Sequence, residues 1–156
     1  MKNAVSAVVF VALATLASSS ATLAANVTVT MDDLMQLSDD EPSSPPNFEG
    51  RSRDAFLLEM EGNDVNVPKA NVFDYSTHDG KFIVQVGLGL LNQGLTMMAC
   101  LQSSKEARGA AIAVVTKPGD YNIKGTFDHY QEGTFKSDLG SWGTLILTEC
   151  TFEQLP

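Results

Sequence analysis

The length, composition and charge of this chain exclude several classes of protein. Its 156 residues fit about one domain, and 44% hydrophobic residues with six prolines and twelve glycines exclude a wholly disordered or collagen-like chain. Ten Lys and Arg against nineteen Asp and Glu give a formal net charge of −9. Because proteins bind nucleic acid largely through Lys and Arg, this charge predicts that the chain binds no nucleic acid.

The first 25 residues have the order of a secretory signal. One positive charge, Lys2, precedes an apolar stretch over residues 4–17, and small residues follow over 18–25. The apolar stretch is shorter than the roughly 20 residues that span a membrane. We therefore predict removal of residues 1–25, no membrane insertion of the mature chain, and a periplasmic or secreted location. Loss of Lys2 changes the net charge to 9 − 19 = −10.

The chain has two cysteines, Cys100 and Cys150, an even number in a chain predicted to be exported. An oxidising compartment would join them in a disulfide. Such a bridge closes a loop of about 50 residues and removes on the order of 4 kcal/mol of unfolded-state freedom. The alternative is a redox or metal pair, but there is no Cys-x-x-Cys, and His78 and His129 are the only histidines for a zinc site. We therefore predict a structural bridge, no metal and no cofactor.

The N-terminal part of the mature chain predicts a short strand followed by a short helix over residues 26–37. Valines 27 and 29 alternate with threonines, and Thr30 stands three residues before Asp33, as in a helix cap. Residues 38–50 are rich in Pro, Ser and acidic residues, which predicts a linker or mobile arm. Its acidic triplet, residues 39–41, lacks the spacing of a calcium loop, so we predict a solvated run of charge.

Residues 51–156 are predicted to form the main domain, in which short strands follow one another. The expected strands lie at residues 55–61, 72–75, 82–86, 95–101, 112–115, 121–127 and 145–152. Ser103 and Glu106 have the spacing of a capping box, which predicts one short helical turn that ends at Gly109. Residues 131–143 hold several glycines, which predicts a loop. Together these elements predict an all-β fold with one short helix, either a small five-stranded barrel or a two-sheet β-sandwich.

Two segments near the end of the chain carry a resemblance to a known family. They are Lys117-Pro118-Gly119-Asp120-Tyr121-Asn122-Ile123-Lys124-Gly125 and Leu145-Ile146-Leu147-Thr148-Glu149-Cys150. These segments resemble exported bacterial proteins with an OB-fold related to the tRNA-anticodon-binding type, over about the last third of the chain. The resemblance implies a helix between the third and fourth strands, and it places both cysteines on the third and fifth strands, which close the barrel. The strand expected near Val72 departs from this pattern and leaves the strand numbering open.

Five aromatic and histidine residues in turn-rich segments are the candidates for ligand binding. They are Tyr75, His78, His129, Tyr130 and Trp142. Each histidine has an aspartate beside it, but neighbouring side chains on a strand point to opposite faces, so adjacency alone predicts no Asp–His pair. Residues 140–143 do not match Gly-x-Ser-x-Gly and are predicted to be a flexible loop with one exposed aromatic residue.

The sequence contains no nucleophile motif, metal spacing or cofactor loop, so we predict a protein that is not an enzyme. The function expected from these observations is a binding or inhibitory module of the cell envelope that recognises a basic protein or a glycan. The alternative is a small secreted hydrolase with a carboxylate-based site that sequence does not reveal.

Overall fold

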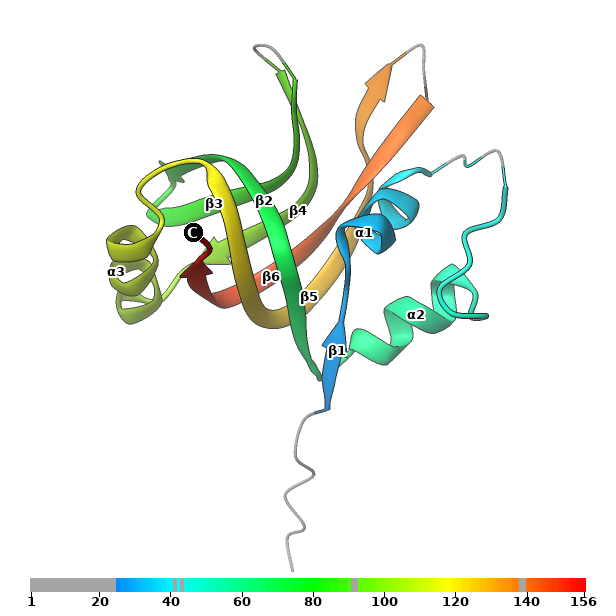
Figure 1. Cartoon of the computed structure of the whole chain (residues 1–156), viewed down its shortest axis with the longest axis horizontal. Helices are drawn as coiled ribbons and strands as arrows, with labels where there is room; N and C mark the ends of the chain where they lie inside the picture. Colours follow the sequence, from blue (N-terminus) through cyan, green and yellow to red (C-terminus); the bar gives the residue numbers. More distant parts are fainter. Residues whose placement is uncertain (1–24, 41, 43, 91–92, 138–139) are drawn as a thin grey trace, which may run out of the picture.

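The computed structural model describes residues 25–40, 42, 44–90, 93–137 and 140–156. Three helices and six strands make up this part of the chain (Figure 1). In chain order they are β1 (Asn26–Thr28), α1 (Met31–Ser38), α2 (Arg53–Met60), β2 (Asp64–His78), β3 (Lys81–Leu90), β4 (Gln93–Gln102), α3 (Lys105–Val114), β5 (Gly119–Ser137) and β6 (Gly140–Gln154). Figure 1 shows α1 and α2 on one side of the strands and α3 on the opposite side.

The five long strands form a closed barrel. Neighbouring strands follow the order β2-β3-β4-β6-β5, and β5 pairs again with β2. The β4–β6 pair is parallel, and the other pairs of the barrel are antiparallel. The predicted small OB-like barrel is confirmed, and the β-sandwich alternative is wrong. Helix α3 lies between the third and fourth barrel strands, where the resemblance placed a helix.

The predicted disulfide is confirmed and joins the two strands that close the barrel. Cys100 in β4 is bonded to Cys150 in β6, with Cα atoms 6.1 Å apart. Gly125 in β5 leaves room for the bridge, because a Cβ atom on it would lie 2.6 Å from Cys150 Sγ. The interior of the barrel is filled by buried side chains at alternating positions of the strands, among them Val65, Val67, Val84, Val86, Met98, Tyr121, Ile123, Leu145 and Leu147.

The first helix follows the prediction and the second does not. Thr30 Oγ1 accepts a hydrogen bond from the backbone N–H of Asp33, and Asp33 Oδ2 accepts one from the Thr30 backbone, so α1 begins with a capping box. Residues 55–61, predicted to be a strand, lie mostly in helix α2. Phe56 and Met60 are both buried and stand four residues apart, which is helical spacing. The apolar residues between them made the segment look like a continuous apolar strand, so the helical spacing was not recognised.

The segment near Val72 is not an extra strand, because it belongs to the 15-residue strand β2. The register with β5 shifts between Val67 and Ala70, and Lys69 at this shift has a φ of 51°. The irregularity allows β2 to pair with two strands, because its first half pairs with β5 and its second half pairs with β3. The segment near Val72 therefore adds no strand, and β2 is the first of the five barrel strands.

Two further predictions of local structure are wrong. Residues 112–115 were expected to be a strand, but α3 continues through Gly109 to Val114. Residues 131–143 were expected to be a loop, but their described part belongs to β5 and β6, with Gln131 opposite Thr144. The register of this hairpin shifts between Gln131 and Phe135, which interrupts the alternation by which a strand is recognised. The division of the chain into an N-terminal element, a linker and a barrel domain stays a prediction, and the predicted signal lies almost entirely outside the described residues.

A carboxylate from β6 caps helix α3. Glu149 Oε1 accepts hydrogen bonds from the backbone N–H groups of Ser103 and Ser104, each at 3.3 Å, and Oε2 accepts one from the Ser104 hydroxyl at 2.7 Å. The bond from the Ser104 hydroxyl, followed by those from the two backbone N–H groups, lowers the pKa of Glu149 below its usual value. The negative charge of Glu149 therefore stabilises the start of α3.

We expect Glu149→Gln to lower the free energy of unfolding by about 0.5–1 kcal/mol at neutral pH. The pKa of Glu149 is lower in the folded chain than in the unfolded chain, so this stabilisation is present above the unfolded pKa, about 4.3, and is lost as the pH falls through the folded pKa. Urea unfolding of both proteins at steps from about pH 7 to about pH 3 measures the difference. A difference that stays constant over this range would contradict the role of the charge.

Candidate binding site

The end of α1, the residues after it and the β5–β6 hairpin meet at Tyr130. The Tyr130 hydroxyl shares its one hydrogen between the Leu37 carbonyl oxygen and Asp40 Oδ1, the latter at 2.8 Å. Asp40 Oδ2 accepts hydrogen bonds from the backbone N–H of Gly133 at 2.7 Å and from the Ser141 hydroxyl at 3.1 Å. Asp40 was predicted to belong to a solvated run of charge, but its carboxylate joins the segment after α1 to both strands of the hairpin.

The Tyr130 hydroxyl stays protonated at neutral pH. Burial, followed by the hydrogen bond to Asp40 and the negative charge of that carboxylate, raises the pKa of Tyr130 above its usual value. The Asp40 carboxylate accepts hydrogen bonds from Tyr130, Gly133 and Ser141, so this pair holds the hairpin in place.

Gly143 in β6 makes the position of Tyr130 possible. Gly143 is buried, and a Cβ atom on it would lie 2.0 Å from the Tyr130 hydroxyl oxygen. The next residue towards the hairpin end, Trp142, is partly buried, and its backbone forms an antiparallel bridge with Asp39. The prediction that residues 140–143 are a flexible loop with an exposed aromatic residue is therefore wrong.

Arg53, the first residue of α2, lies beside Tyr130. Its Nη2 donates to the backbone carbonyl of Gln36 at 3.3 Å and to that of Asp39, at the C-terminal end of α1, where a positive charge is favourable. Its Cζ lies 5.9 Å from the centre of the Tyr130 ring. Among the described residues, the buried Nε of Arg53 has no hydrogen-bond partner. One edge of the guanidinium group is thus bound to the protein and the Nε donor is not.

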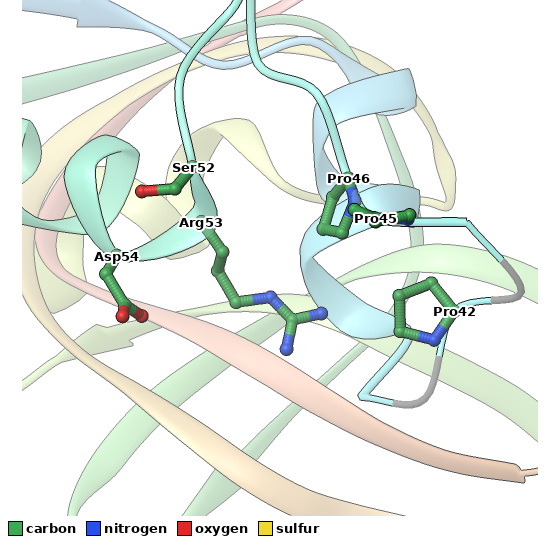
Figure 2. Close-up of a pocket in the computed structure, with 6 residues that line it drawn as sticks. All are labelled: Pro42, Pro45, Pro46, Ser52, Arg53 and Asp54. Atoms are coloured by element: carbon green, nitrogen blue, oxygen red, sulfur yellow. The ribbon is translucent and has the colours of Figure 1, made fainter.

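Two pockets lie beside Arg53 and Trp142 and share three prolines. The proline pocket has a volume of about 410 Å³ (Figure 2). Its walls are Pro42, Pro45, Pro46, Ser52, Arg53 and Asp54. The tryptophan pocket has a volume of about 380 Å³, and its walls include the same prolines together with Met35 and Trp142. Both volumes lie in the range of small-molecule sites, roughly 300–1,000 Å³.

Two of the five predicted site residues, Tyr75 and His78, lie far from these pockets. The Tyr75 hydroxyl donates to the backbone carbonyl of Thr116, 2.7 Å away, just after α3. His78 is exposed at the end of β2, in a turn where the Gly80 carbonyl accepts a hydrogen bond from Arg108 of α3. Both residues thus lie on the α3 side of the barrel, opposite α1 and α2 in Figure 1.

His129, on β5, forms a pair with the residue before it. Its Nδ1 lies 2.6 Å from Asp128 Oδ2, although neighbouring side chains on a regular strand point apart. The register of β5 against β6 shifts between Phe127 and His129, and this irregularity brings the two side chains to one side. His129 lines neither pocket. Of the predicted site residues, Tyr130 and Trp142 are therefore the two that the structure brings to one place.

In the part of the chain that the structure describes, no three His, Cys, Asp or Glu side chains come together as metal ligands would. None of the described helices has the length and apolar character required to cross a membrane.

No protein-family model matches the chain, and no curated relative was found. Among solved structures, it is similar to two crystal structures of the mitochondrial single-stranded DNA binding protein Rim1 from S. cerevisiae, one of them labelled with selenomethionine. Both are 9% identical to this chain, and each alignment covers 60% of this chain and 97% of that protein. The TM-scores are 0.38 and 0.35.

These neighbours contradict two predictions that we made from the charge of the chain. Both are named for binding single-stranded DNA, whereas the net charge of −9 led us to exclude nucleic acid and to expect a basic envelope protein or a glycan. Net charge describes the average field of a protein and does not describe the groups that form one site on its surface. Nucleic acid is no longer excluded, and the envelope protein and the glycan are no longer proposed as partners.

Proposed function

We propose that this chain is a non-catalytic binding protein whose ligand site consists of the proline pocket and the adjoining tryptophan pocket. The observation that carries the proposal is the pair of pockets itself, since two apolar hollows of small-molecule size share the walls formed by Pro42, Pro45 and Pro46. The ligand class is a small molecule with an aromatic or other apolar ring, which fits walls of proline, methionine and tryptophan.

The hydrogen bonds of the surrounding residues support a binding role. The Tyr130 hydroxyl and the Asp40 carboxylate are hydrogen-bonded to each other, and Asp40 also accepts from Gly133 and Ser141. These groups fix the walls of the site before a ligand binds, which is the role we assign to them. We also propose that the chain is related to OB-fold proteins of the tRNA-anticodon-binding type. We further propose a periplasmic or secreted location, which the disulfide supports.

Titration with benzyl alcohol, a neutral aromatic probe, tests the proposal. Trp142 is the single tryptophan of the chain and lines one of the pockets, so its fluorescence reports binding directly. We expect a saturable change in the wild-type protein and binding weakened about threefold or more by Met35→Ala, which removes apolar wall area. Leu58→Ala is the matched control, because Leu58 is also an exposed apolar residue on a helix but lies outside both pockets.

Two results would overturn the proposed site. The first is a fluorescence change that does not saturate or that responds equally to both alanine substitutions. The second is salt-sensitive binding of an oligothymidylate together with no saturable binding of benzyl alcohol, which would indicate a nucleic-acid surface in place of the pocket site.

A further inference from the structure

We infer that the proline pocket binds organic anions, a carboxylate or a phosphate on an apolar ring, and that the Arg53 guanidinium group is the anion-binding group. The inference rests on the proposed function and names the chemistry of its ligand. Carboxylate and phosphate share the property that matters here, which is two or more oxygens able to accept from one planar guanidinium group.

The hydrogen bonds of Arg53 show which of its donors the protein already uses. Nη2 donates to two backbone carbonyls of α1 and the residue after it, which fixes the side chain in place before any ligand arrives. Nε is buried and has no partner among the described residues. A buried donor without an acceptor is unfavourable, so an acceptor that reaches Nε would be bound favourably.

The carboxylates of Asp54 and Asp40 are directed away from the pocket or bonded to other donors. Figure 2 shows Arg53 reaching towards the prolines, while the Asp54 carboxylate points away from them. Asp40, which is hydrogen-bonded to Tyr130, accepts from three donors other than Arg53. The remaining negative charge of the chain acts on the site only weakly beyond about 8 Å at physiological ionic strength.

The prolines make the walls of the pocket apolar. Pro42, Pro45 and Pro46 form apolar walls beside the charged group (Figure 2). An apolar wall lowers the local dielectric constant and strengthens the attraction between the guanidinium group and an anion. An anion attached to a ring therefore fits better than a fully hydrated anion such as inorganic phosphate.

Four probes test this inference on the full chain. Benzoate and phenyl phosphate carry the anion, benzamide is the neutral match of benzoate, and inorganic phosphate lacks the ring. We expect benzoate and phenyl phosphate to bind at least about tenfold more tightly than benzamide, because each makes a charge-assisted hydrogen bond to Arg53. Two-dimensional NMR should show the largest shifts at the backbone amides of Ser52, Arg53 and Asp54.

Three charge variants locate the effect. We expect Arg53→Gln to abolish the preference for benzoate over benzamide, and Asp54→Asn to strengthen benzoate binding by removing a nearby negative charge. Arg51→Gln is the matched control, because Arg51 carries the same charge but pairs with Glu49 and Glu59 and lies over the Phe56 ring, outside the pocket. The Asp54→Asn result keeps the test decisive if Arg53→Gln fails to fold.

The outcomes separate this inference from the proposed function. Equal affinity for benzoate and benzamide at the pocket would overturn the role of Arg53 and leave the binding site standing. Binding of neither ligand, together with no binding of benzyl alcohol, would overturn the proposed function itself. If Arg51→Gln and Arg53→Gln weaken benzoate binding equally, the anion is attracted by the surface charge in general and not by Arg53. That result would also overturn the inference.

Discussion

Replacing Cys100 and Cys150 together by alanine will lower the free energy of unfolding by about 3–4 kcal/mol. The bridge spans 50 residues of chain and ties β4 to β6, so its loss frees the unfolded chain while removing a buried contact between the closing strands. Urea unfolding followed by circular dichroism measures the difference. Reduced wild-type protein should match the variant closely, and a loss below about 1 kcal/mol would show that the bridge adds little to the closed barrel.

Gly143→Ala will lower the free energy of unfolding by about 2–4 kcal/mol, because the new Cβ atom occupies the position of the Tyr130 hydroxyl. To make room, the ring has to move and break its hydrogen bonds to Leu37 and Asp40. Gly109→Ala is the matched control, because Gly109 is exposed in α3 with no atom within 4 Å of an added Cβ. Alanine there should stabilise the protein by up to about 1 kcal/mol.

A double-mutant cycle with Tyr130→Phe tests the reason for the Gly143 effect. Without the hydroxyl, the hydrogen bonds to Leu37 and Asp40 are already absent, so Gly143→Ala should be less destabilising in the Tyr130→Phe variant than in the wild type. Part of the effect should remain, since the ring carbon that carries the hydroxyl would also lie only 2.3 Å from the new Cβ atom. Equal effects in both proteins would mean that the two residues do not act through this contact.

The parts of the fold that were predicted correctly depend on short-range signals. The pair Thr30 and Asp33 predicts α1 because a capping box is complete within four residues. The apolar residues at every second position, such as Met97 and Ala99, predict strand β4. Helix α2 was missed because Leu57 and Leu58 stand between its buried residues and suggest a continuous apolar strand. There the burial of Phe56 by the rest of the protein decided the structure.

The candidate site could be predicted only in part, because its contacts are long-range. Tyr130 and Trp142 were predicted as aromatic residues of turn-rich segments, and they reach the site as strand residues. The contact between Asp40 and Tyr130 spans 90 positions, and no local pattern around either residue indicates the other. No sequence signal points to Arg53, since its carbonyl partners on and just after α1 lie 17 and 14 positions earlier in the chain.

The parallel pairing of β4 with β6 has a consequence for the order in which the chain can fold during synthesis. β6 is the last of the barrel strands to be made, yet it pairs with both β4 and β5 and carries one of the two cysteines. Until it emerges, one edge of β4 is without its neighbour and Cys100 remains a free thiol. A growing chain therefore exposes both an unpaired strand edge, which invites aggregation, and a reactive sulfur, so folding factors that protect nascent chains have a defined interval in which to act.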